Sequence, residues 1–152
     1  MEVKIIKATK ENVKKANEFL TRLIHDEKKY DNNINEGYKV LYYYENMIDI
    51  DANCLLYATI SNEIVGYLYG FAITFDESYF VKQARLEAMF VDEQYQGNKI
   101  GEKLVDEFIK WAKSKDVERI ELCVLNGNKQ ALSLYKKIGF KTTKQIMAIE
   151  VR

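Results

Sequence analysis

The order of apolar and polar positions along the chain predicts alternating strands and helices. Apolar residues at three- and four-residue steps indicate four helices, within residues 13–24, 36–48, 100–112 and 131–138. In the second of these, the run Tyr42, Tyr43, Tyr44 could equally be a strand. Short β-type runs indicate about seven strands, at residues 3–8, 54–60, 64–75, 84–91, 119–125, 140–143 and 146–151. We therefore expect an α/β fold whose mixed, mostly antiparallel sheet of about seven strands is flanked by four helices.

Two strands carry further detail. In the strand at 84–91, simple alternation predicts two faces, with Arg85, Glu87, Met89 and Val91 on one and Leu86, Ala88 and Phe90 on the other. In the strand at 64–75, Gly66 and Gly70 indicate a bulge or a close approach of another backbone.

Length and charge narrow the class of protein. The 152 residues fit a single domain over 1–152, and 47% hydrophobic content suffices for a core. Lys plus Arg and Asp plus Glu both number 23, so the basic surface that nucleic-acid binding needs is not expected. No run of about 18 apolar residues and no signal-like start occurs, which predicts a cytoplasmic protein without a membrane partner.

The cysteines and the histidine suggest no metal or nucleophilic chemistry. Cys54 and Cys123 lie far apart, without partners at metal-ligand spacing, and we expect both to be buried core thiols. We therefore expect no metal. The only histidine, His25, falls on the first predicted helix, which argues against a nucleophile–histidine triad.

A small-residue turn precedes the long predicted helix. It comprises Gln96, Gly97, Asn98, Lys99, Ile100 and Gly101. Such a turn leaves backbone N–H groups free at the positive end of a helix, where a diphosphate binds. The alternative is an ordinary strand-to-helix loop. The sequence of residues 96–101 matches neither a Walker loop nor the dinucleotide-binding fingerprint.

A second group of residues lies near the C-terminus, where Asn128, Ala131, Tyr135, Gly139 and Phe140 read Asn-x-x-Ala-x-x-x-Tyr-x-x-x-Gly-Phe. Helical spacing puts Asn128, Ala131 and Tyr135 on one face, so a polar cap and a phenol would line the same groove. The alternative for Tyr135 is an ordinary half-buried helix aromatic.

In this order and spacing, the two groups together with Phe90 and Val91 resemble the GNAT superfamily of acyl-CoA-dependent N-acetyltransferases. The resemblance covers nearly the whole chain and implies a GNAT-like sheet in which acetyl-CoA, as cosubstrate, lies where strands 84–91 and 119–125 splay apart. It implies that the main chain of Met89, Phe90 and Val91 binds the pantetheine amides. It further implies that the diphosphate is held by the amides of Gln96, Gly97, Asn98, Lys99, Ile100, Gly101 and Glu102. Lys99 departs from the family pattern, which usually has Gly there.

The same resemblance assigns roles to three side chains. Asn128 would reach the pantetheine arm, and Tyr135 would donate a proton to the departing thiolate. Glu87 lies in a strand that looks like the corresponding strand of the polyamine acetyltransferases, whose glutamate acts as base through a water. The alternative is that Glu87 forms a surface ion pair with Arg85 or Lys82.

The sequence says least about the acceptor, the molecule that would receive the acetyl group. Residues 26–51 hold seven acids (Asp26, Glu27, Asp31, Glu36, Glu45, Asp49, Asp51) and three lysines, which would favour a cationic acceptor. We therefore expect transfer of an acetyl group from acetyl-CoA to a primary amine of a small polycationic molecule, such as a polyamine, aminoglycoside or diamino acid. A protein lysine or N-terminal acetyltransferase and a noncatalytic acyl-CoA-binding regulatory module are the alternatives, and a homodimer is left open.

Overall fold

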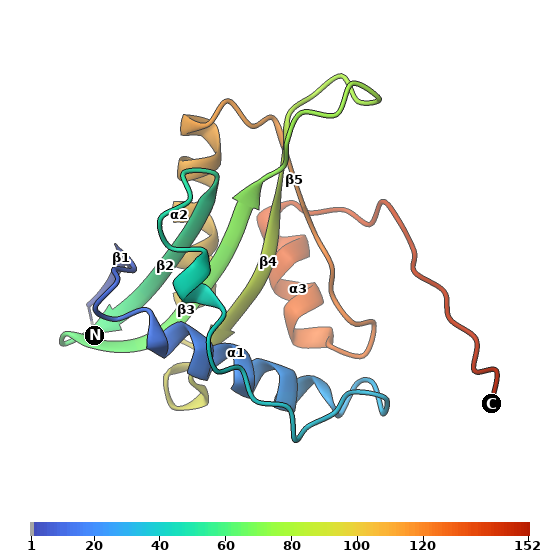
Figure 1. The fold of residues 1–152 in the computed structure, drawn as a ribbon, viewed down its shortest axis with the longest axis horizontal. Helices are drawn as coiled ribbons and strands as arrows, with labels where there is room; N and C mark the ends of the chain where they lie inside the picture. The colour runs from blue at the N-terminus through green and yellow to red at the C-terminus, as the bar shows by residue number, and fades with distance from the viewer. Residues whose placement is uncertain (1) are drawn as a thin grey trace.

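The computed structural model describes residues 2–152 and contains one five-stranded mixed sheet (Figure 1). Its strands lie in the order β1-β2-β3-β4-β5, and they are β1 (Val3–Lys7), β2 (Asn53–Ile60), β3 (Glu63–Ala72), β4 (Gln83–Val91) and β5 (Arg119–Leu122). The first four pair antiparallel, whereas β4 and β5 run parallel. The α/β class and the mixed sheet are confirmed, with five strands in place of seven.

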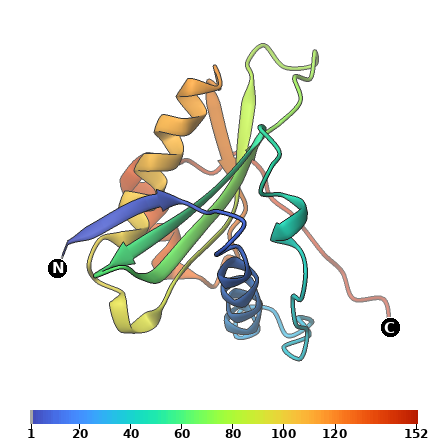
Figure 2. The same cartoon turned by 60° about the vertical axis from the view of Figure 1, so that its left-hand side comes forward.

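The helices cover both faces of this sheet. They are α1 (Lys14–Glu27), α2 (Ile100–Ser114) and α3 (Lys129–Ile138). Figures 1 and 2 show α1 on one face and α2 with α3 on the other. Each face buries its own cluster, centred on Phe108 of α2 on one side and on Phe19 of α1 on the other. No helix among residues 2–152 is long and apolar enough to cross a membrane.

The helix predicted at 36–48 is wrong. The structure has a loop that ends in one short 3₁₀ helix, η1 (Tyr44–Asn46). The loop is attached to α1 because Asn17 Oδ1 accepts from the backbone N–H groups of Tyr43 at 3.3 Å and Tyr44 at 3.1 Å. Val40 and Tyr44 are buried separately, so the apolar spacing marks two anchor points and not a helix face.

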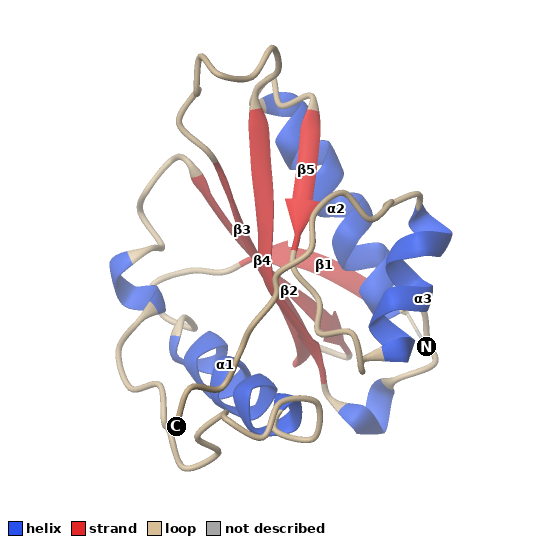
Figure 3. Cartoon of the chain, turned by 90° about the vertical axis from the view of Figure 1, so that its right-hand side faces the viewer, coloured by secondary structure: helices blue, strands red, loops and turns tan. Residues whose placement is uncertain are grey.

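The two strands predicted at 140–143 and 146–151 are also wrong. After α3 the chain is drawn as a loop that leaves the body of the protein (Figures 1 and 3). Residues 141–152 form no backbone–backbone hydrogen bond within the described chain. The apolar pattern suits an extended strand, but a strand exists only where another edge pairs with it.

Candidate functional site

Strands β4 and β5 separate halfway along β4. They pair only from Gln83 with Arg119 to Leu86 with Leu122. Beyond that point β4 continues to Val91, whereas β5 ends at Leu122 and not at Leu125 as the sequence suggested. The edge of β4 at residues 87–91 that faces away from β3 therefore has no strand neighbour in the described chain. Its peptide groups are free to bind an extended amide-containing ligand.

A β-bulge lies at the point of separation. In the β3–β4 pairing Tyr69 opposes Ala88 and Gly70 opposes Leu86, which leaves Glu87 without an opposite residue. The bulge reverses the alternation, because Leu86 packs in the cluster beneath α2 while Ala88 packs in the cluster beneath α1. The prediction of one continuous face from Arg85 to Val91 is therefore wrong.

Gly70 makes this bulge possible. A Cβ there would overlap the ring of Phe108 and lie 2.6 Å from the carbonyl oxygen of Arg85. The close backbone approach predicted from the glycine is confirmed. The aromatic ring of α2 can therefore sit directly against the strand at the position where the sheet opens.

The loop between β4 and α2 presents free backbone donors. Within residues 2–152, the N–H groups of the six residues from Gly97 to Glu102 have no hydrogen-bond acceptor. Gly97 has φ +88° and Lys99 has φ +59°, so two left-handed residues turn the chain into the helix. The helix dipole adds positive potential at the same place. This arrangement fits an anion such as a diphosphate.

Side chains hold the loop to its neighbours. Gln96 Nε2 donates to the carbonyl oxygen of Val91 at 3.3 Å, and Asn98 Nδ2 donates to that of Tyr95, in the 3₁₀ helix η2 (Glu93–Tyr95), at 2.9 Å. The backbone N–H of Gln96 is engaged within the turn, with Glu93 O at 3.4 Å. The structure thus leaves six of the seven predicted amides free and uses the first to shape the turn.

Three elements meet at Gly101. A Cβ on this residue would lie 3.1 Å from Leu134 Cδ2 of α3 and 3.4 Å from Met89 Cε of β4. The start of α2 is therefore packed against the unpaired half of β4 and against the helix that carries Tyr135. The two sequence motifs, which are about 30 residues apart, are brought together in space.

Tyr135 and Asn128 both belong to α3. Tyr135 is half-buried and packs edge-on against Phe140, with ring centroids 5.7 Å apart. Burial raises the pKa of its phenol to about 12, so the hydroxyl is protonated at neutral pH. Asn128 is the N-cap of the helix, where Oδ1 accepts from the N–H of Ala131 at 3.1 Å. Its Nδ2 has no acceptor within residues 2–152 and stays available to a ligand.

Glu87 is exposed and lies beside two tyrosines. Burial raises the pKa of Tyr43, and the Glu87 carboxylate raises it further. The pKa of Tyr69 is raised to about 12 by burial first, then by Tyr43 and then by Glu87. The rings of Tyr43 and Tyr69 pack edge-on, 6.4 Å between centroids. Sequence reasoning missed both tyrosines. The only signal was the run Tyr42-Tyr43-Tyr44, which we interpreted as part of a helix or, equally, as a strand.

The alternative ion pairs for Glu87 are not formed. Arg85 Nη2 pairs instead with Glu121 Oε1 at 2.6 Å, and Lys82 Nζ donates to the carbonyl oxygen of Lys115 at 2.8 Å. The carboxylate of Glu87 therefore has no cationic partner within 4 Å among residues 2–152. It is free to accept a proton or to attract a cation.

The acidic segment does not form the continuous patch that its composition suggested. Asp49 pairs with Lys10 at 3.1 Å and Asp51 with Lys115 at 2.9 Å. Glu45 is drawn inward, where it accepts from Asn17 Nδ2 at 2.7 Å. Acids with no ion pair in the described chain remain at the end of α1, at Asp26, Glu27 and Asp31, and burial raises the pKa of Glu27.

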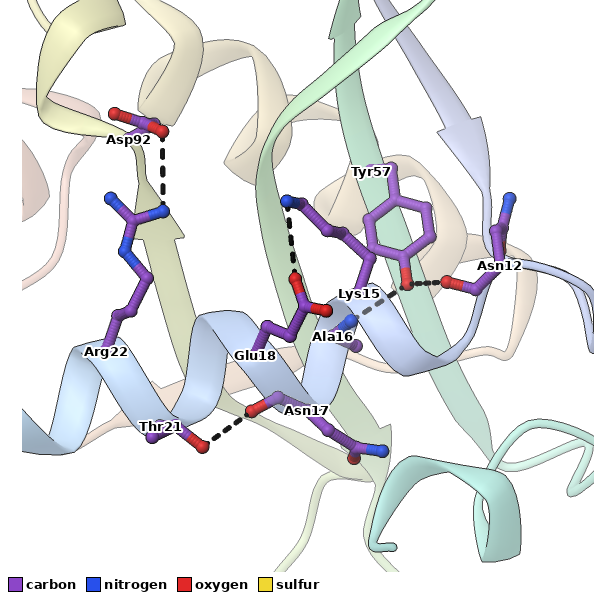
Figure 4. Close-up of polar contacts among 9 residues, drawn as sticks. All are labelled: Asn12, Lys15, Ala16, Asn17, Glu18, Thr21, Arg22, Tyr57 and Asp92. Atoms are coloured by element: carbon purple, nitrogen blue, oxygen red, sulfur yellow. Dashed lines mark hydrogen bonds and ion pairs between the residues drawn. The ribbon is translucent and has the colours of Figure 1, made fainter. Parts of the chain in front are cut away.

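Helix α1 is fixed to the sheet by polar contacts (Figure 4). Tyr57 donates to the carbonyl oxygen of Asn12 at 2.7 Å and accepts from the N–H of Ala16 at 3.1 Å. Arg22 Nη1 pairs with Asp92 Oδ2 at 3.3 Å, just after β4 ends. The acidic end of α1 is therefore held on the same side of the sheet as the tyrosines and the end of β4.

The remaining candidates lie outside this arrangement. Cys54 is buried, and burial raises its pKa to about 12, whereas Cys123 is exposed and the expectation of a core thiol there is wrong. His25 Nε2 lies 3.1 Å from the carbonyl oxygen of Tyr38. No group of three or more His, Cys, Asp or Glu in the described chain is arranged to hold a metal ion.

Comparison with known sequences identifies related proteins. Residues 18–140 match the acetyltransferase (GNAT) family. The spermine/spermidine N(1)-acetyltransferase of Bacillus subtilis (strain 168) is 32% identical over 81 residues, 52% of this chain and 53% of that protein. The N-alpha-acetyltransferase of Sulfurisphaera tokodaii is 30% identical over 115 residues, 72% of this chain and 68% of that protein. The chain thus spans about half to two thirds of the length of these two relatives.

Solved structures share the fold. A tetramutant of the BH1408 protein from Bacillus halodurans superposes with a TM-score of 0.86 at 20% identity, covering 97% of this chain and 99% of that one. AAC(6')-Iy in complex with the bisubstrate analog CoA-S-monomethyl-acetylneamine gives 0.76 at 13% identity, covering 100% and 99%. At these identities the likeness shows the fold alone.

Proposed function

Because the chain belongs to the acetyltransferase (GNAT) family, we propose that it transfers the acetyl group of acetyl-CoA to a primary amine of a small polycationic molecule. The observation that carries the proposal is the row of six free N–H groups from Gly97 to Glu102. They lie next to the half of β4 that β5 leaves unpaired. The diphosphate and the amide-containing pantetheine arm belong to one acetyl-CoA molecule, so a site for it needs the anion-binding turn and the unpaired strand edge next to each other.

The residues of the chain supply positioning and proton transfer. A thioester is already activated, so a neutral amine held in line can attack it directly, and good alignment is worth roughly 7 to 11 kcal/mol of barrier. Tyr135, protonated with its pKa near 12, donates a proton to the departing thiolate. Glu87, which has no ion-pair partner in the described chain, accepts the proton that the ammonium group of the acceptor must lose before the neutral amine attacks. The second proton, lost from nitrogen as the C–S bond breaks and the amide forms, replaces the one that Tyr135 gives to the thiolate.

The surroundings of Glu87 support a cationic acceptor. A carboxylate beside the rings of Tyr43 and Tyr69 offers both charge and aromatic faces to an ammonium group. The acids at the end of α1 add negative potential on the same face. The relative that acts on spermine and spermidine has an acceptor of this class.

Acetylation of a protein N-terminus is the second candidate. It is favoured by the relative named N-alpha-acetyltransferase, which matches 72% of this chain. A noncatalytic acyl-CoA-binding module is the third. It would use the loop at Gly97 but would have no use for Tyr135 and Glu87.

A thiol-release assay distinguishes the three candidates. Purified protein with acetyl-CoA is offered spermidine, spermine, an aminoglycoside, a diamino acid and peptides with a free N-terminus or a lysine. We expect acetyl-CoA-dependent release of CoA with one of the small polycationic amines and the highest kcat/KM for that class. Preference for a peptide would replace the acceptor assignment. Binding of CoA without release on any amine would favour the regulatory module.

A further inference from the structure

Three polar side chains of α1 lie at intervals of four residues and contact the backbone of one segment. They are Asn17, Thr21 and His25. Residues four positions apart share a face of a helix, so these three form one polar row along α1. Figure 4 shows the first two on the same side of α1, with Asn17 pointing toward η1. The row faces residues 38–45, which lead into η1 and which we call the 38–45 segment.

The C-terminal part of the row bonds the beginning of the 38–45 segment. His25 Nε2 lies 3.1 Å from the carbonyl oxygen of Tyr38, and Thr21 Oγ1 accepts from the N–H of Val40 at 3.0 Å. The Thr21 hydroxyl also donates to the carbonyl oxygen of Asn17 at 2.9 Å. The segment therefore runs along α1 in the direction opposite to the helix. Side chains of α1 hold residues 38–43, because these residues belong to no helix or strand of the described chain.

Asn17 makes most of the contacts with the 38–45 segment and is only 3% exposed. Its Oδ1 accepts from the N–H of Tyr43 at 3.3 Å and from that of Tyr44 at 3.1 Å. Its Nδ2 donates to Glu45 Oε1 at 2.7 Å and to the carbonyl oxygen of Leu41 at 3.5 Å. A side-chain amide has two donors and can accept twice, so its full hydrogen-bonding capacity is used here. Such a buried, fully bonded amide fixes the backbone that it contacts.

The contacts of Asn17 determine where the ring of Tyr43 lies. Tyr44 is buried in the core and anchors the far side of the segment. Tyr43 stays 38% exposed, and its ring packs edge-on against that of Tyr69, with 6.4 Å between centroids. The Glu87 carboxylate is near enough to raise the pKa of both phenols. Asn17 thus holds the backbone of an aromatic residue that lies beside the proposed base.

We propose that Asn17 is a positioning residue that sets the affinity of the site for a cationic acceptor, by holding the ring of Tyr43 beside Glu87. The inference rests on the proposed function, because it needs an ammonium group next to Glu87. A carboxylate and an aromatic ring bind one ammonium together only when both are held near it. A ring on an unanchored segment would have to be ordered on binding, and that entropy cost would weaken the affinity. Asn17 is buried, so it acts through Tyr43 and not by touching the acceptor.

The test compares the KM for the amine with the KM for acetyl-CoA in Asn17→Leu and Tyr43→Ala. Leucine has a similar volume to asparagine but can neither donate nor accept. Each variant should raise the KM for the amine roughly 3- to 10-fold. The KM for acetyl-CoA and the kcat should change by less than about twofold, because the lost contact binds only the acceptor. The matched control is Tyr42→Ala, which removes a neighbouring tyrosine that is 66% exposed and should leave the KM for the amine unchanged.

Combining the two substitutions tests whether Asn17 acts through Tyr43. Adding Asn17→Leu to Tyr43→Ala should raise the KM for the amine no further, because the ring that Asn17 positions is already gone. Two increases that multiply would overturn the proposal. So would an unchanged KM for the amine in Tyr43→Ala, a measurement that does not require Asn17→Leu to fold.

A rescue with unchanged net charge separates positioning from a loss of stability. Asn17→Asp combined with Glu45→Gln keeps an oxygen that accepts from Tyr43 and Tyr44, and it reverses donor and acceptor between positions 17 and 45. This pair of substitutions should bring the KM for the amine back to within about twofold of the wild-type value. A KM as high as that of Asn17→Leu would contradict the proposal.

Hydrogen exchange provides a readout that does not depend on activity. The amides of Tyr43 and Tyr44 should exchange at least roughly tenfold faster in Asn17→Leu than in the wild type. Unchanged exchange would show that Asn17 does not hold the segment and would overturn the proposal. If the wild type releases no CoA with any amine, the proposed function fails and the acceptor role of Asn17 fails with it. Raised KM values with wild-type turnover of the amine would support both.

Discussion

At the residue scale, the proposed acid is Tyr135, whose phenol is half-buried on α3. Its pKa of about 12 keeps the phenol protonated up to about pH 10, so this group should cause no alkaline loss of rate below that pH. We expect Tyr135→Phe to lower kcat by about 100-fold while the KM for acetyl-CoA stays nearly unchanged. Steady-state kinetics from pH 6 to about pH 10 test this, and an unchanged kcat would remove the role.

Glu87 is the second prediction at this scale. Glu87→Gln cannot accept a proton, so its rate should fall about 10- to 100-fold at neutral pH and recover as the pH approaches the pKa of the amine, near 10. The matched control is Glu77→Gln, which changes an exposed carboxylate in the loop between β3 and β4. A pH–rate profile for Glu87→Gln that parallels the wild type would contradict the assignment.

At the element scale, the turn at the start of α2 contains a strained residue within the proposed diphosphate-binding loop. Lys99 is a non-glycine residue with φ +59°, a conformation that costs about 1 kcal/mol and that glycine adopts freely. We expect Lys99→Gly to leave stability unchanged or to raise it by up to about 1 kcal/mol. Lys103→Gly, inside the same helix, should cost about 1 kcal/mol. Urea unfolding measures both, and an equal loss in the two variants would show that the turn is not strained.

One ion pair joins β4 and β5 beside the opening, in addition to their backbone pairing. Arg85, 2.6 Å from the Glu121 carboxylate, holds the pKa of that carboxyl below its usual range. A lowered pKa in the folded state means that the stabilisation is complete above about pH 4.5 and is lost as the pH falls through the folded value.

Glu121→Gln should therefore lower the free energy of unfolding at pH 7 by about 1 kcal/mol and flatten its dependence on acid pH. Glu118→Gln, an exposed neighbour, is the control. Thermal unfolding between pH 3 and pH 7 provides the comparison. If Glu121→Gln kept the acid dependence of the wild type, the pair would not contribute.

At the scale of the whole molecule, sequence patterns predicted features that depend on neighbouring residues, such as the end of a helix. Gly139 ends α3 with φ +123°, as its position after the apolar stripe indicated. Periodicity could not show which side chains serve as isolated anchors, and Val40 and Tyr44 were therefore interpreted as a helix face. It also could not show the bulge at Glu87, because an extra residue in a strand follows from the pairing with β3 and from the space that Gly70 leaves.

The candidate site was predicted only in part, because sequence patterns show local features and not contacts between residues that are distant in sequence. The small residues from Gln96 to Gly101 predicted the turn that the structure has at Gly97, because a turn depends on residues close together in sequence. The role of Tyr135 stays a prediction from the family resemblance. Tyr43 and Tyr69 come from a loop and from β3, and only the folded chain places them next to Glu87. The last two predicted strands do not form because residues 141–152 pair with no strand of the described chain, and strand pairing depends on contacts far apart in sequence.

The central claim is that the free N–H groups at the start of α2 and along the unpaired half of β4 bind coenzyme A. Titration of the ¹⁵N-labelled protein with CoA, followed by its amide resonances, observes these groups one by one. We predict saturable shifts concentrated at residues 97–102 and 88–91, with smaller changes elsewhere. No saturable shift, or shifts confined to other parts of the chain, would contradict the account.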